Sequence, residues 1–456
     1  MKKEIWITIC AIFFVAALIV SFVIVSSEPV SSQTIAVYSS DVVSHGDIIA
    51  SQTDTMQTVP TTAETQESSS PEETSASATE QTASEQTTTT TLPPRKVSAK
   101  EDMRAIWVPY MTLNKPTKEK LDSIVDTAEK YGCNAIMLHV RPFCDALYDS
   151  DLFPTSHLLT GTQGDKMTLD VLGYVIEKAH AKDIEVHAWL NPLRIQLRNS
   201  TPKTLAENNP YNVWRNDSNA ENDNWVVDYS KGKYFNPAYP EVREYIVNGI
   251  REIVRKYDVD GIHWDDYFYP ASDESFDDSA AYNKYTSEGG KKSLKDWRKE
   301  NINKLVKDSY SAVKTLKSNV VFGISPGGNM GNCRNAGADI DTWCSENGYV
   351  DYICPQIYWS FDHSTAPFDK ICRNWRKLVT NKNIKFYVGL ALYKAGSDDD
   401  KGTWQGSNDI LAREVRFAGS DEIHADGFMI YSYDYLKKDQ TKEEVKNLMT
   451  ALKERD

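Results

Sequence analysis

Eight short runs of branched and aromatic residues recur within residues 101–456, and a stretch with helical periodicity follows each of them. In order along the chain they read RAIWVPY, NAIMLHVRP, IEVHAWLNP, DGIHWDD, VVFGISP, DYICPQIYW, KFYVGLALY and GFMIYSYD. Strands that alternate with amphipathic helices pair in parallel, and the helices cover the sheet. Eight such units predict an α/β fold, the TIM (β/α)8 barrel.

An open, doubly wound sheet is the alternative arrangement for the same units. A sheet of that kind normally carries a glycine-rich phosphate-binding turn after its first strand. The residues that follow the first run here read MTLNKPT and contain no glycine. The closed barrel is therefore the favoured prediction.

The chain begins with a long apolar segment. Residues 5–25 are 21 consecutive uncharged residues, enough at about 1.5 Å per residue to cross a hydrocarbon layer of ~30 Å. Lys2 and Lys3 precede this segment, which predicts a cytoplasmic N-terminus and an extracellular C-terminal domain. We expect residues 1–25 to be a signal anchor in the cell membrane, with a cleaved signal peptide and a secreted protein as the alternative.

Residues 26–100 form a second region, rich in Ser, Thr, Gln, Glu and Pro. Such a composition cannot bury enough apolar surface to offset the entropy lost on ordering, so we expect a disordered linker. The linker has ten acidic and three basic residues, a charge of −7 out of −14 for the whole chain. The acidic balance therefore says little about the ligand of the barrel, and we expect no nucleic-acid partner.

Alternation along each strand separates side chains that face the helices from those that face the barrel axis. In the second run the apolar residues Ile136 and Leu138 form the outer set, which turns His139 and Arg141 inward. The same reasoning predicts these inward residues in later runs: His187, Trp189, Asn191, His263, Asp265, Gln356, Tyr358 and Tyr393. Their polar members gather at the C-terminal strand ends, where barrel enzymes place their active sites.

The fourth run ends in a pair of carboxylates. Asp265 is its last inward position, so the side chain should reach the mouth of the barrel, and Asp266 begins the loop that follows. Helix capping or a salt bridge would also account for such a pair. The convergence of amide, guanidinium and aromatic side chains on the same mouth favours a functional site.

Sugar rings need aromatic faces for stacking and fixed donors for their hydroxyl groups. The strand ends supply the aromatic faces of Trp189, Tyr267, Tyr358 and Tyr393. The same ends supply the donors Arg141, Asn191, Arg194 and Gln356. The predicted ligand is therefore a polysaccharide or glycan.

Three inward histidines allow a different chemistry. His139, His187 and His263 lie on consecutive strands, and with Asp265 they could hold the metal of a metal-dependent hydrolase. The first run lacks the His-x-His pair that such enzymes use, and the histidines lie a layer below the mouth. We expect them to form a hydrogen-bonded floor, with no metal and no cofactor.

Several long motifs carry a resemblance to a known family: GCNAIMLHVRPFCDALYDSDLFPTSHLLTG, AHAKDIEVHAWLNPLR, DGIHWDDYFYP, FGISP and DYICPQIYW. Through them residues 101–456 resemble the glycosyl-hydrolase-like 10 family of bacterial envelope proteins. The resemblance implies a TIM barrel with glycosidase activity and peptidoglycan glycan strands as substrate. The motif residues it marks are Arg141, Asp145, Asn191, Arg194, Asp265, Asp266, Tyr267, Gln356 and Tyr358.

The sequence also departs from the family pattern. PTS stands where Pro-Trp-Ser is expected, NPLR replaces Asn-Pro-Tyr-Arg, and ISPGGNM lacks an aromatic residue after Ser-Pro. These differences bear on sugar subsites more than on the reaction.

The mechanism has two alternatives at this point. Retaining barrel glycosidases use two carboxylates about 5 Å apart, but the seventh run continues as LALYKAG and offers none. Either Asp145, Asp266 or Asp434 supplies the second carboxylate, or the N-acetyl group of the substrate acts as the nucleophile. The adjacent pair and the later Gln-x-Tyr favour the second alternative.

Taken together, the sequence predicts an extracytoplasmic glycoside hydrolase that cleaves N-acetylated cell-wall glycan, with Asp265 and Asp266 as the acid/base pair. Two alternatives remain: a wall protein that binds carbohydrate through a barrel without catalysis, and a metal-dependent hydrolase that uses His139, His187 and His263.

Overall fold

The computed structural model describes residues 100–198 and 201–454. The expected membrane segment at residues 5–25 and almost all of the expected linker lie outside these described residues. Within the two described ranges, no helix has both the length and the apolar character needed to cross a bilayer.

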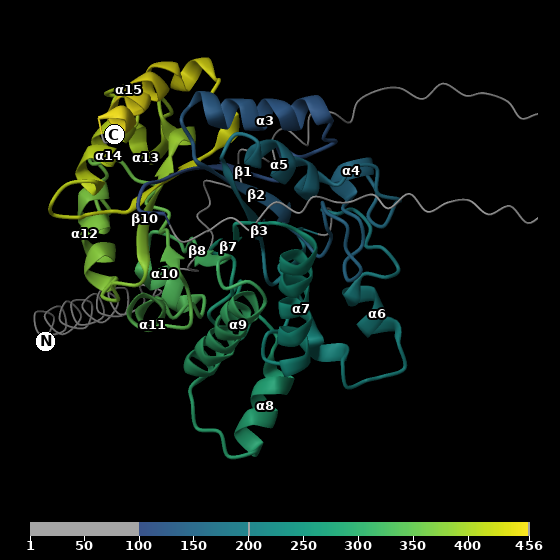
Figure 1. The fold of residues 1–456 in the computed structure, drawn as a ribbon. Helices are drawn as coiled ribbons and strands as arrows, with labels where there is room; N and C mark the ends of the chain where they lie inside the picture. Colours follow the sequence, from purple (N-terminus) through teal and green to yellow (C-terminus); the bar gives the residue numbers. More distant parts are fainter. Residues whose placement is uncertain (1–99, 199–200, 455–456) are drawn as a thin grey trace, which may run out of the picture. The chain divides into compact units, whose positions relative to one another are not determined.

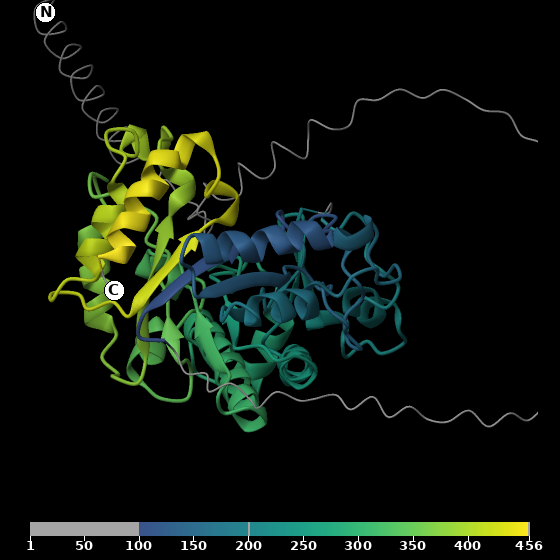
Figure 2. The ribbon, with the colours of Figure 1, turned by 45° about the horizontal axis from the view of Figure 1, so that its top comes forward.

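Eight parallel strands close into a barrel in the order β1-β2-β3-β7-β8-β9-β10-β11. Their bounds are β1 Met103–Val108, β2 Ala135–Arg141, β3 Glu185–Leu190, β7 Gly261–Trp264, β8 Val321–Ile324, β9 Tyr352–Ile353, β10 Lys385–Ala391 and β11 Gly427–Tyr431. The last strand pairs in parallel with the first, and Figure 2 shows the yellow strand beside the blue one. Each predicted run contains one barrel strand, so the predicted TIM barrel is confirmed.

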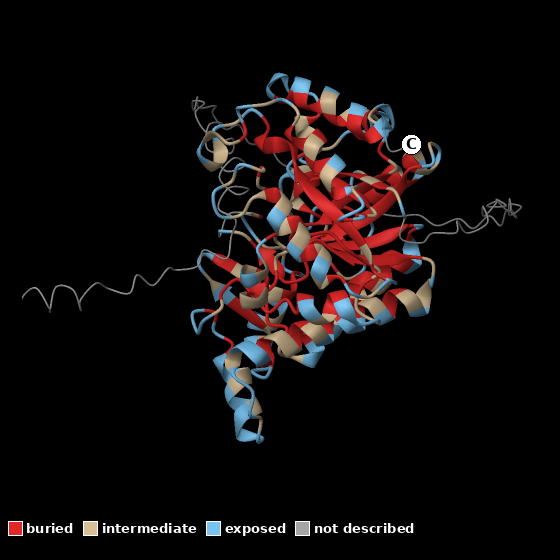
Figure 3. Ribbon diagram, turned by 90° about the vertical axis from the view of Figure 1, so that its left-hand side faces the viewer, coloured by how far each residue is buried: buried red, intermediate tan, exposed pale blue. Residues whose placement is uncertain are grey.

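Helices surround the barrel (Figure 1). The helices of the βα units are α3 Lys118–Lys130, α5 Val171–His180, α7 Pro240–Lys256, α9 Leu294–Leu316, α10 Met330–Asn335, α11 Ile340–Ser345, α12 Phe368–Leu378, α14 Ile410–Ala418 and α15 Lys442–Lys453. Further helical pieces lie in the loops: α4 His157–Thr160, α6 Pro210–Asn216, α8 Ser279–Ser287, α13 Asp399–Gly402, η1 Asp223–Trp225, η2 Leu392–Lys394, η3 Tyr433–Tyr435 and η4 Asp439–Thr441. Figure 3 shows the strands buried and the outer helix faces exposed.

The helix α7 shows how sequence places a helix on the barrel. Pro240 occupies its first turn, where the missing N–H is not needed. Val242, Ile246, Ile250 and Ile253 repeat at helical spacing, and all four side chains are buried. This apolar stripe packs the helix against the barrel.

A small antiparallel sheet is inserted between β3 and α7. Its strands, in the order β4-β6-β5, are β4 Arg194–Gln196, β6 Gly232–Phe235 and β5 Val226–Tyr229. Ser230 and Lys231 turn the β5–β6 hairpin with positive φ angles of 45° and 67°, which suit the right-handed twist of the paired strands. The insertion brings Arg194 to the C-terminal end of the barrel.

Arg141 departs from the predicted alternation. The pairing of β2 with β3 shifts register between His139 and Arg141, so that Arg141 lies opposite the outward residue Leu190. Its guanidinium lies 4.6 Å from the centroid of the Phe153 ring, and a Cβ at Gly249 of α7 would lie 2.5 Å from that ring. The prediction that Arg141 points inward is therefore wrong, because this side chain is buried on the outer, α7-facing side of the barrel wall.

Two carboxyl groups are buried where α14 packs on α15. Glu444 accepts a hydrogen bond of 2.6 Å from the main-chain N–H of Leu411, in the first turn of α14. Neither carboxyl oxygen of Glu414 has a hydrogen-bond partner within the described part of the chain. Burial raises the pKa of Glu414 well above its ordinary value and that of Glu444 to about 7.

We expect the Glu414→Gln variant to lose part of the pH dependence of stability. The native carboxyl holds its proton more tightly than the unfolded one, whose pKa is ~4.3, so the free energy of unfolding falls as pH rises above that value. An amide cannot ionise, so the free energy of unfolding of the variant should exceed that of the wild type by ~1–3 kcal/mol at about pH 8. At about pH 5 the two free energies should be similar. Thermal unfolding across this pH range measures the difference.

The matched control is Glu422→Gln, because Glu422 is an exposed glutamate that pairs with Arg373. This control should keep the pH dependence of the wild type. Equal pH dependence in the wild-type and Glu414→Gln proteins would contradict the assignment of a neutral carboxyl in the native state.

Candidate active site at the C-terminal mouth of the barrel

Asp265 follows β7 and is held by two side chains of the β3 segment. Its Oδ2 accepts a hydrogen bond of 2.9 Å from Nε1 of Trp189 and another from Nδ2 of Asn191. The other oxygen, Oδ1, accepts a long contact of 3.4 Å from the main-chain N–H of Tyr267. Asp265 is 3% exposed, so the predicted inward positions of Trp189, Asn191 and Asp265 are confirmed.

Arg194 fixes the orientation of Asn191. The guanidinium donates to Oδ1 of Asn191 and, through Nε, to the carbonyl oxygen of Pro142 at 2.9 Å. Arginine can only donate, so the oxygen of the Asn191 amide faces Arg194 and its NH2 group faces Asp265. The same guanidinium lies 4.7 Å from the ring centroid of Tyr267 and 5.0 Å from that of Phe143.

Asp266 turns toward the other side of β7. Its Oδ1 accepts a hydrogen bond of 3.1 Å from Nε2 of Gln356, which also donates to the carbonyl oxygen of Ser325 at 3.0 Å. A Cβ at Gly327 would lie 3.5 Å from Oδ2 of Asp266. The two adjacent carboxylates therefore diverge, with Asp265 directed to β3 and Asp266 to the ends of β8 and β9.

Burial dominates the electrostatics of this pair. It raises the pKa of Asp265 to about 7, and the neighbouring Asp266 adds to the rise. Arg194 and the hydrogen bonds from Trp189 and Asn191 act in the opposite direction, because they favour the ionised form. Burial also raises the pKa of Asp266, which is partly exposed at the mouth. The site can therefore hold a proton near neutral pH.

Tyrosine rings form one wall of the mouth. Tyr358, Tyr393 and Tyr431 pack on one another with centroid distances of 5.7–6.0 Å. Tyr358 and Tyr393 are 7% and 8% exposed, so only their edges reach the mouth. Tyr110 follows β1, the barrel neighbour of β11, and packs edge-on against His139 and Phe143.

A directional chain of hydrogen bonds fills the barrel below the site. Nε1 of Trp107 donates to Nε2 of His263, which leaves the proton of His263 on Nδ1, 2.9 Å from the Tyr352 hydroxyl. That hydroxyl can then donate to Nδ1 of His187 at 3.2 Å, and Nε2 of His187 lies 3.3 Å from Glu185. The sequence of donors assigns one tautomer to each of these rings.

The third histidine of the predicted floor is used differently. His139 stacks on Trp189 with a centroid distance of 3.7 Å and an angle of 11°. Burial lowers the pKa of His139 and of His263 well below the usual value, so both rings are neutral. Among residues 100–198 and 201–454, no three His, Cys, Asp or Glu side chains are placed to hold a metal ion.

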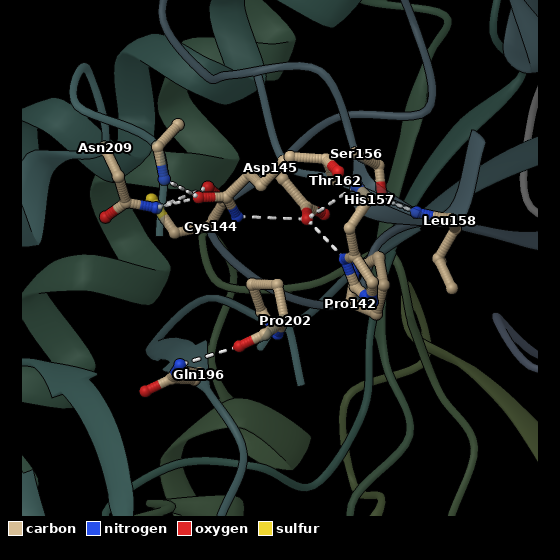
Figure 4. A network of polar contacts seen from close by, with 12 residues as sticks. Pro142, Cys144, Asp145, Ser156, His157, Leu158, Thr162, Gln196, Pro202 and Asn209 are labelled. Atoms are coloured by element: carbon tan, nitrogen blue, oxygen red, sulfur yellow. Dashed lines mark hydrogen bonds and ion pairs between the residues drawn. The ribbon is translucent and has the colours of Figure 1, made fainter. Parts of the chain in front are cut away.

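Asp145 lies in a buried network beside the mouth (Figure 4). It is fully buried, and its Oδ2 accepts hydrogen bonds from Nδ1 of His157 at 2.9 Å and from Nε2 of Gln163 at 3.1 Å. In this position Asp145 is shielded from the mouth, and the predicted substrate contact of Asp145 stays a prediction. The sequence analysis did not select His157, although it lies within the motif that contains Asp145.

The structure brings together nine of the eleven predicted site residues: Trp189, Asn191, Arg194, Asp265, Asp266, Tyr267, Gln356, Tyr358 and Tyr393. Arg141 and Asp145 lie outside this group. Asp434, a candidate for a second carboxylate, follows β11 and accepts a hydrogen bond from the hydroxyl of Thr112. Tyr110 was missed because the run that it ends, RAIWVPY, has no carboxylate, amide or histidine that would mark a site.

Comparisons with known proteins agree with this geometry. The family described as glycosyl hydrolase-like 10 matches residues 102–405. Glycosyl hydrolase YngK of Bacillus subtilis (strain 168) is 35% identical over 327 residues, which cover 66% of this chain and 62% of YngK. This chain thus spans less than two thirds of that relative. Glycosyl hydrolase DigH of Escherichia coli (strain K12) is 30% identical over 379 residues, which cover 76% of this chain and 84% of DigH.

Solved structures share the fold at low sequence identity. The catalytic domain of beta-amylase from Paenibacillus polymyxa has a TM-score of 0.54 at 11% identity, covering 79% of this chain and 99% of that one. The PgaB (BpsB) glycoside hydrolase domain from Bordetella bronchiseptica has a TM-score of 0.51 at 13% identity, covering 76% and 99%. These two likenesses concern the barrel alone. The family match and the two relatives establish that the chain belongs to the glycosyl hydrolase-like 10 family.

Proposed function

We propose that this protein is a glycoside hydrolase that acts outside the cytoplasm on bacterial cell-wall glycan, with N-acetylated peptidoglycan strands as its substrate. The observation that carries the proposal is the pair Asp265 and Asp266, whose pKa values are both raised and which lie at the mouth between aromatic walls. Membership of the family and the two relatives named glycosyl hydrolases support the reaction class.

Asp265 is the proton donor in this proposal. Its Oδ2 already accepts two hydrogen bonds, so the proton belongs on Oδ1, which accepts the long contact from Tyr267. The proton passes to the glycosidic oxygen as its bond to C1 breaks, and the leaving sugar departs with a hydroxyl group. The same carboxylate then takes a proton from the water that completes the hydrolysis.

In this proposal the proton resides on Asp265 and Asp266 keeps its charge, since two neighbouring buried carboxyl groups take up one proton more readily than they both ionise. Asp266 accepts a hydrogen bond from the N–H of the 2-acetamido group, whose carbonyl oxygen attacks C1. Two other carboxylates are less suited to the role of nucleophile, because Asp145 is fully buried and Asp434 is bonded to Thr112. Assistance by the substrate restricts the reaction to N-acetylated sugars.

The proposed location rests on the sequence. Residues 5–25 are long and apolar enough for a membrane anchor, and an extracellular barrel would have direct access to the cell wall. A cleaved segment would give a secreted protein with the same access.

The Asp265→Asn variant should lose at least about 100-fold in the rate of hydrolysis of purified, peptide-free wall glycan, because general acid catalysis typically contributes 10²–10⁴-fold. Binding of the same glycan should persist, since the aromatic and amide groups of the mouth remain. Mass spectrometry of the released saccharides measures turnover, and equilibrium binding to both proteins measures affinity. Wild-type digestion of sacculi with and without stem peptides identifies the bond that is cleaved.

Asp434→Asn is the matched control and should retain most of the activity. Aryl glycosides with good leaving groups separate the two acids, since a good leaving group needs no proton and should rescue Asp265→Asn but not Asp266→Asn. If aryl glycosides rescued only Asp266→Asn, Asp266 would be the proton donor and Asp265 would be the partner of the acetamido group. Retention of more than about a tenth of the rate by Asp265→Asn would contradict its assignment as the acid.

Trp189→Phe should move the alkaline limb of the pH–rate profile to higher pH. The indole N–H stabilises the ionised form of Asp265, so its removal raises the pKa of Asp265 further, by about one unit. The reaction needs the proton on Asp265, so activity should persist to higher pH in the variant. The dependence of kcat/KM on pH measures the limb.

Trp359→Phe is the control, because Trp359 is an aromatic residue of the segment after β9 and contacts His363. A downward shift in Trp189→Phe, or an equal shift in the control, would argue against Asp265 as the titrating group.

Activity should survive chelation. The histidines inside the barrel are engaged in a hydrogen-bond chain and a ring stack, which predicts that no metal participates. Turnover of wall glycan before and after dialysis against EDTA tests this expectation. Loss of turnover that zinc or manganese restores would favour the metal-dependent alternative.

A further inference from the structure

An imidazole is held at the rim of the mouth by a buried carboxylate. Asp145 accepts from Nδ1 of His157 at 2.9 Å and from its main-chain N–H at 3.4 Å. A carboxylate can only accept such bonds, so Nδ1 of His157 carries a proton. In the neutral ring Nε2 is then an acceptor, directed away from Asp145. Figure 4 shows the His157 ring turned toward the Asp145 carboxylate.

Further buried side chains hold Asp145 and its surroundings in place. Gln163 donates to Asp145 at 3.1 Å, and its own Oε1 accepts from Nδ2 of Asn209 at 3.0 Å and from the main-chain N–H of Ala206 at 2.9 Å. Asn209 also donates to the carbonyl oxygen of Cys144. Asp145, Gln163 and Asn209 are 0–5% exposed, whereas the His157 side chain is 14% exposed. The network therefore presents one partly exposed ring.

Capping of α4 does not account for this arrangement. Ser156 already caps the helix, because its side chain accepts from the main-chain N–H of Leu158. The helix is only four residues long. A buried carboxylate and two amide side chains exceed what the start of such a helix requires, which leaves the orientation of His157 to be explained.

The position of His157 connects it with the candidate active site. Its ring lies 5.5 Å from that of Phe143, which in turn contacts Arg194 of the site. The loop after β1 runs beside α4, since the main-chain N–H of Lys115 donates to the carbonyl oxygen of Leu158 at 2.7 Å. That loop carries Tyr110, whose ring packs on Phe143, and Met111, which is 40% exposed.

We propose that His157, Tyr110 and Met111 form an outer sugar-binding subsite. Nε2 of His157 accepts a hydrogen bond from a hydroxyl group of a sugar residue beyond the bond that is cleaved. Tyr110 and Met111 offer apolar surface to the same sugar ring, as aromatic and thioether groups do in carbohydrate sites. The subsite rests on the proposed function and extends it, because it selects glycan chains over short fragments.

A second histidine–aspartate pair lies at nearly the same distance. Nε2 of His180 lies 2.8 Å from Oδ2 of Asp260, and the His180 side chain is 17% exposed. Asp260 also accepts from the main-chain N–H of Val186, so this pair joins the end of α5 to the starts of β3 and β7. It lies at the N-terminal end of the barrel, away from the mouth, and serves as a matched control.

The experiment compares kcat and KM for a disaccharide and a hexasaccharide prepared from peptide-free wall glycan. His157→Ala should lower the ratio of the hexasaccharide kcat/KM to the disaccharide kcat/KM by roughly fivefold to tenfold, mainly through KM, as expected for one lost hydrogen bond. His157→Gln keeps an acceptor near Nε2 and should restore part of the ratio. His180→Ala should leave the ratio at the wild-type value.

Several outcomes would overturn the subsite. An unchanged kcat/KM ratio in His157→Ala would do so, and so would an equal fall of this ratio in His180→Ala. A third such outcome is a His157→Gln variant that has the wild-type melting temperature but recovers none of the ratio. A wild-type protein that cleaves neither substrate would overturn the subsite together with the proposed function. Turnover by the wild type without a length-dependent loss in His157→Ala would overturn the subsite alone.

Discussion

The burial of the Asp265 carboxylate at the end of β7 is the constraint on which the organisation of the mouth depends. A carboxylate that is 3% exposed beside a second acid needs donors, or it takes up a proton. Trp189 and Asn191 supply those donors from the neighbouring strand, and Arg194 orients Asn191 from the inserted sheet. These donors offset only part of the effect of burial, so the pKa of Asp265 stays raised to about 7.

The hydrogen-bond chain inside the barrel lies directly below the residues that surround Asp265. Each ring from Trp107 to His187 donates in one direction, and the chain ends on Glu185, whose other oxygen lies 3.3 Å from Nζ of Lys100. The neutral imidazoles of His139 and His263 avoid a buried positive charge near the site. His139 closes the floor by stacking under Trp189, which fixes the indole that donates to Asp265. The histidines thus act through position, not through their charge.

The sequence predicts those parts that follow from regular periodicity. Strands β3 and β7 alternate without interruption, so counting in twos placed Trp189, Asn191 and Asp265 correctly. The same alternation gave the wrong face for Arg141, because a register shift after His139 turns the Arg141 side chain to the outer face. Hydrophobic patterning does not reveal a bulge within an otherwise apolar run. The β4–β6 sheet escaped prediction because its strands have three or four residues. Asp145 was found as a motif residue, but its burial depends on loop contacts from distant residues such as Gln163.

The demands on Arg194 show why an arginine occupies this position. One side chain donates to Asn191 and to the carbonyl oxygen of Pro142 while its flat face lies against Tyr267 and Phe143. A lysine ammonium is a compact charge without a planar face, so it could not donate in two fixed directions and stack on two rings at once. Arg194 therefore links the acid at β7 to the rim that holds His157, through Asn191 on one side and Phe143 on the other. A shift of this guanidinium would disturb the proton balance of Asp265 and the packing of the rim together.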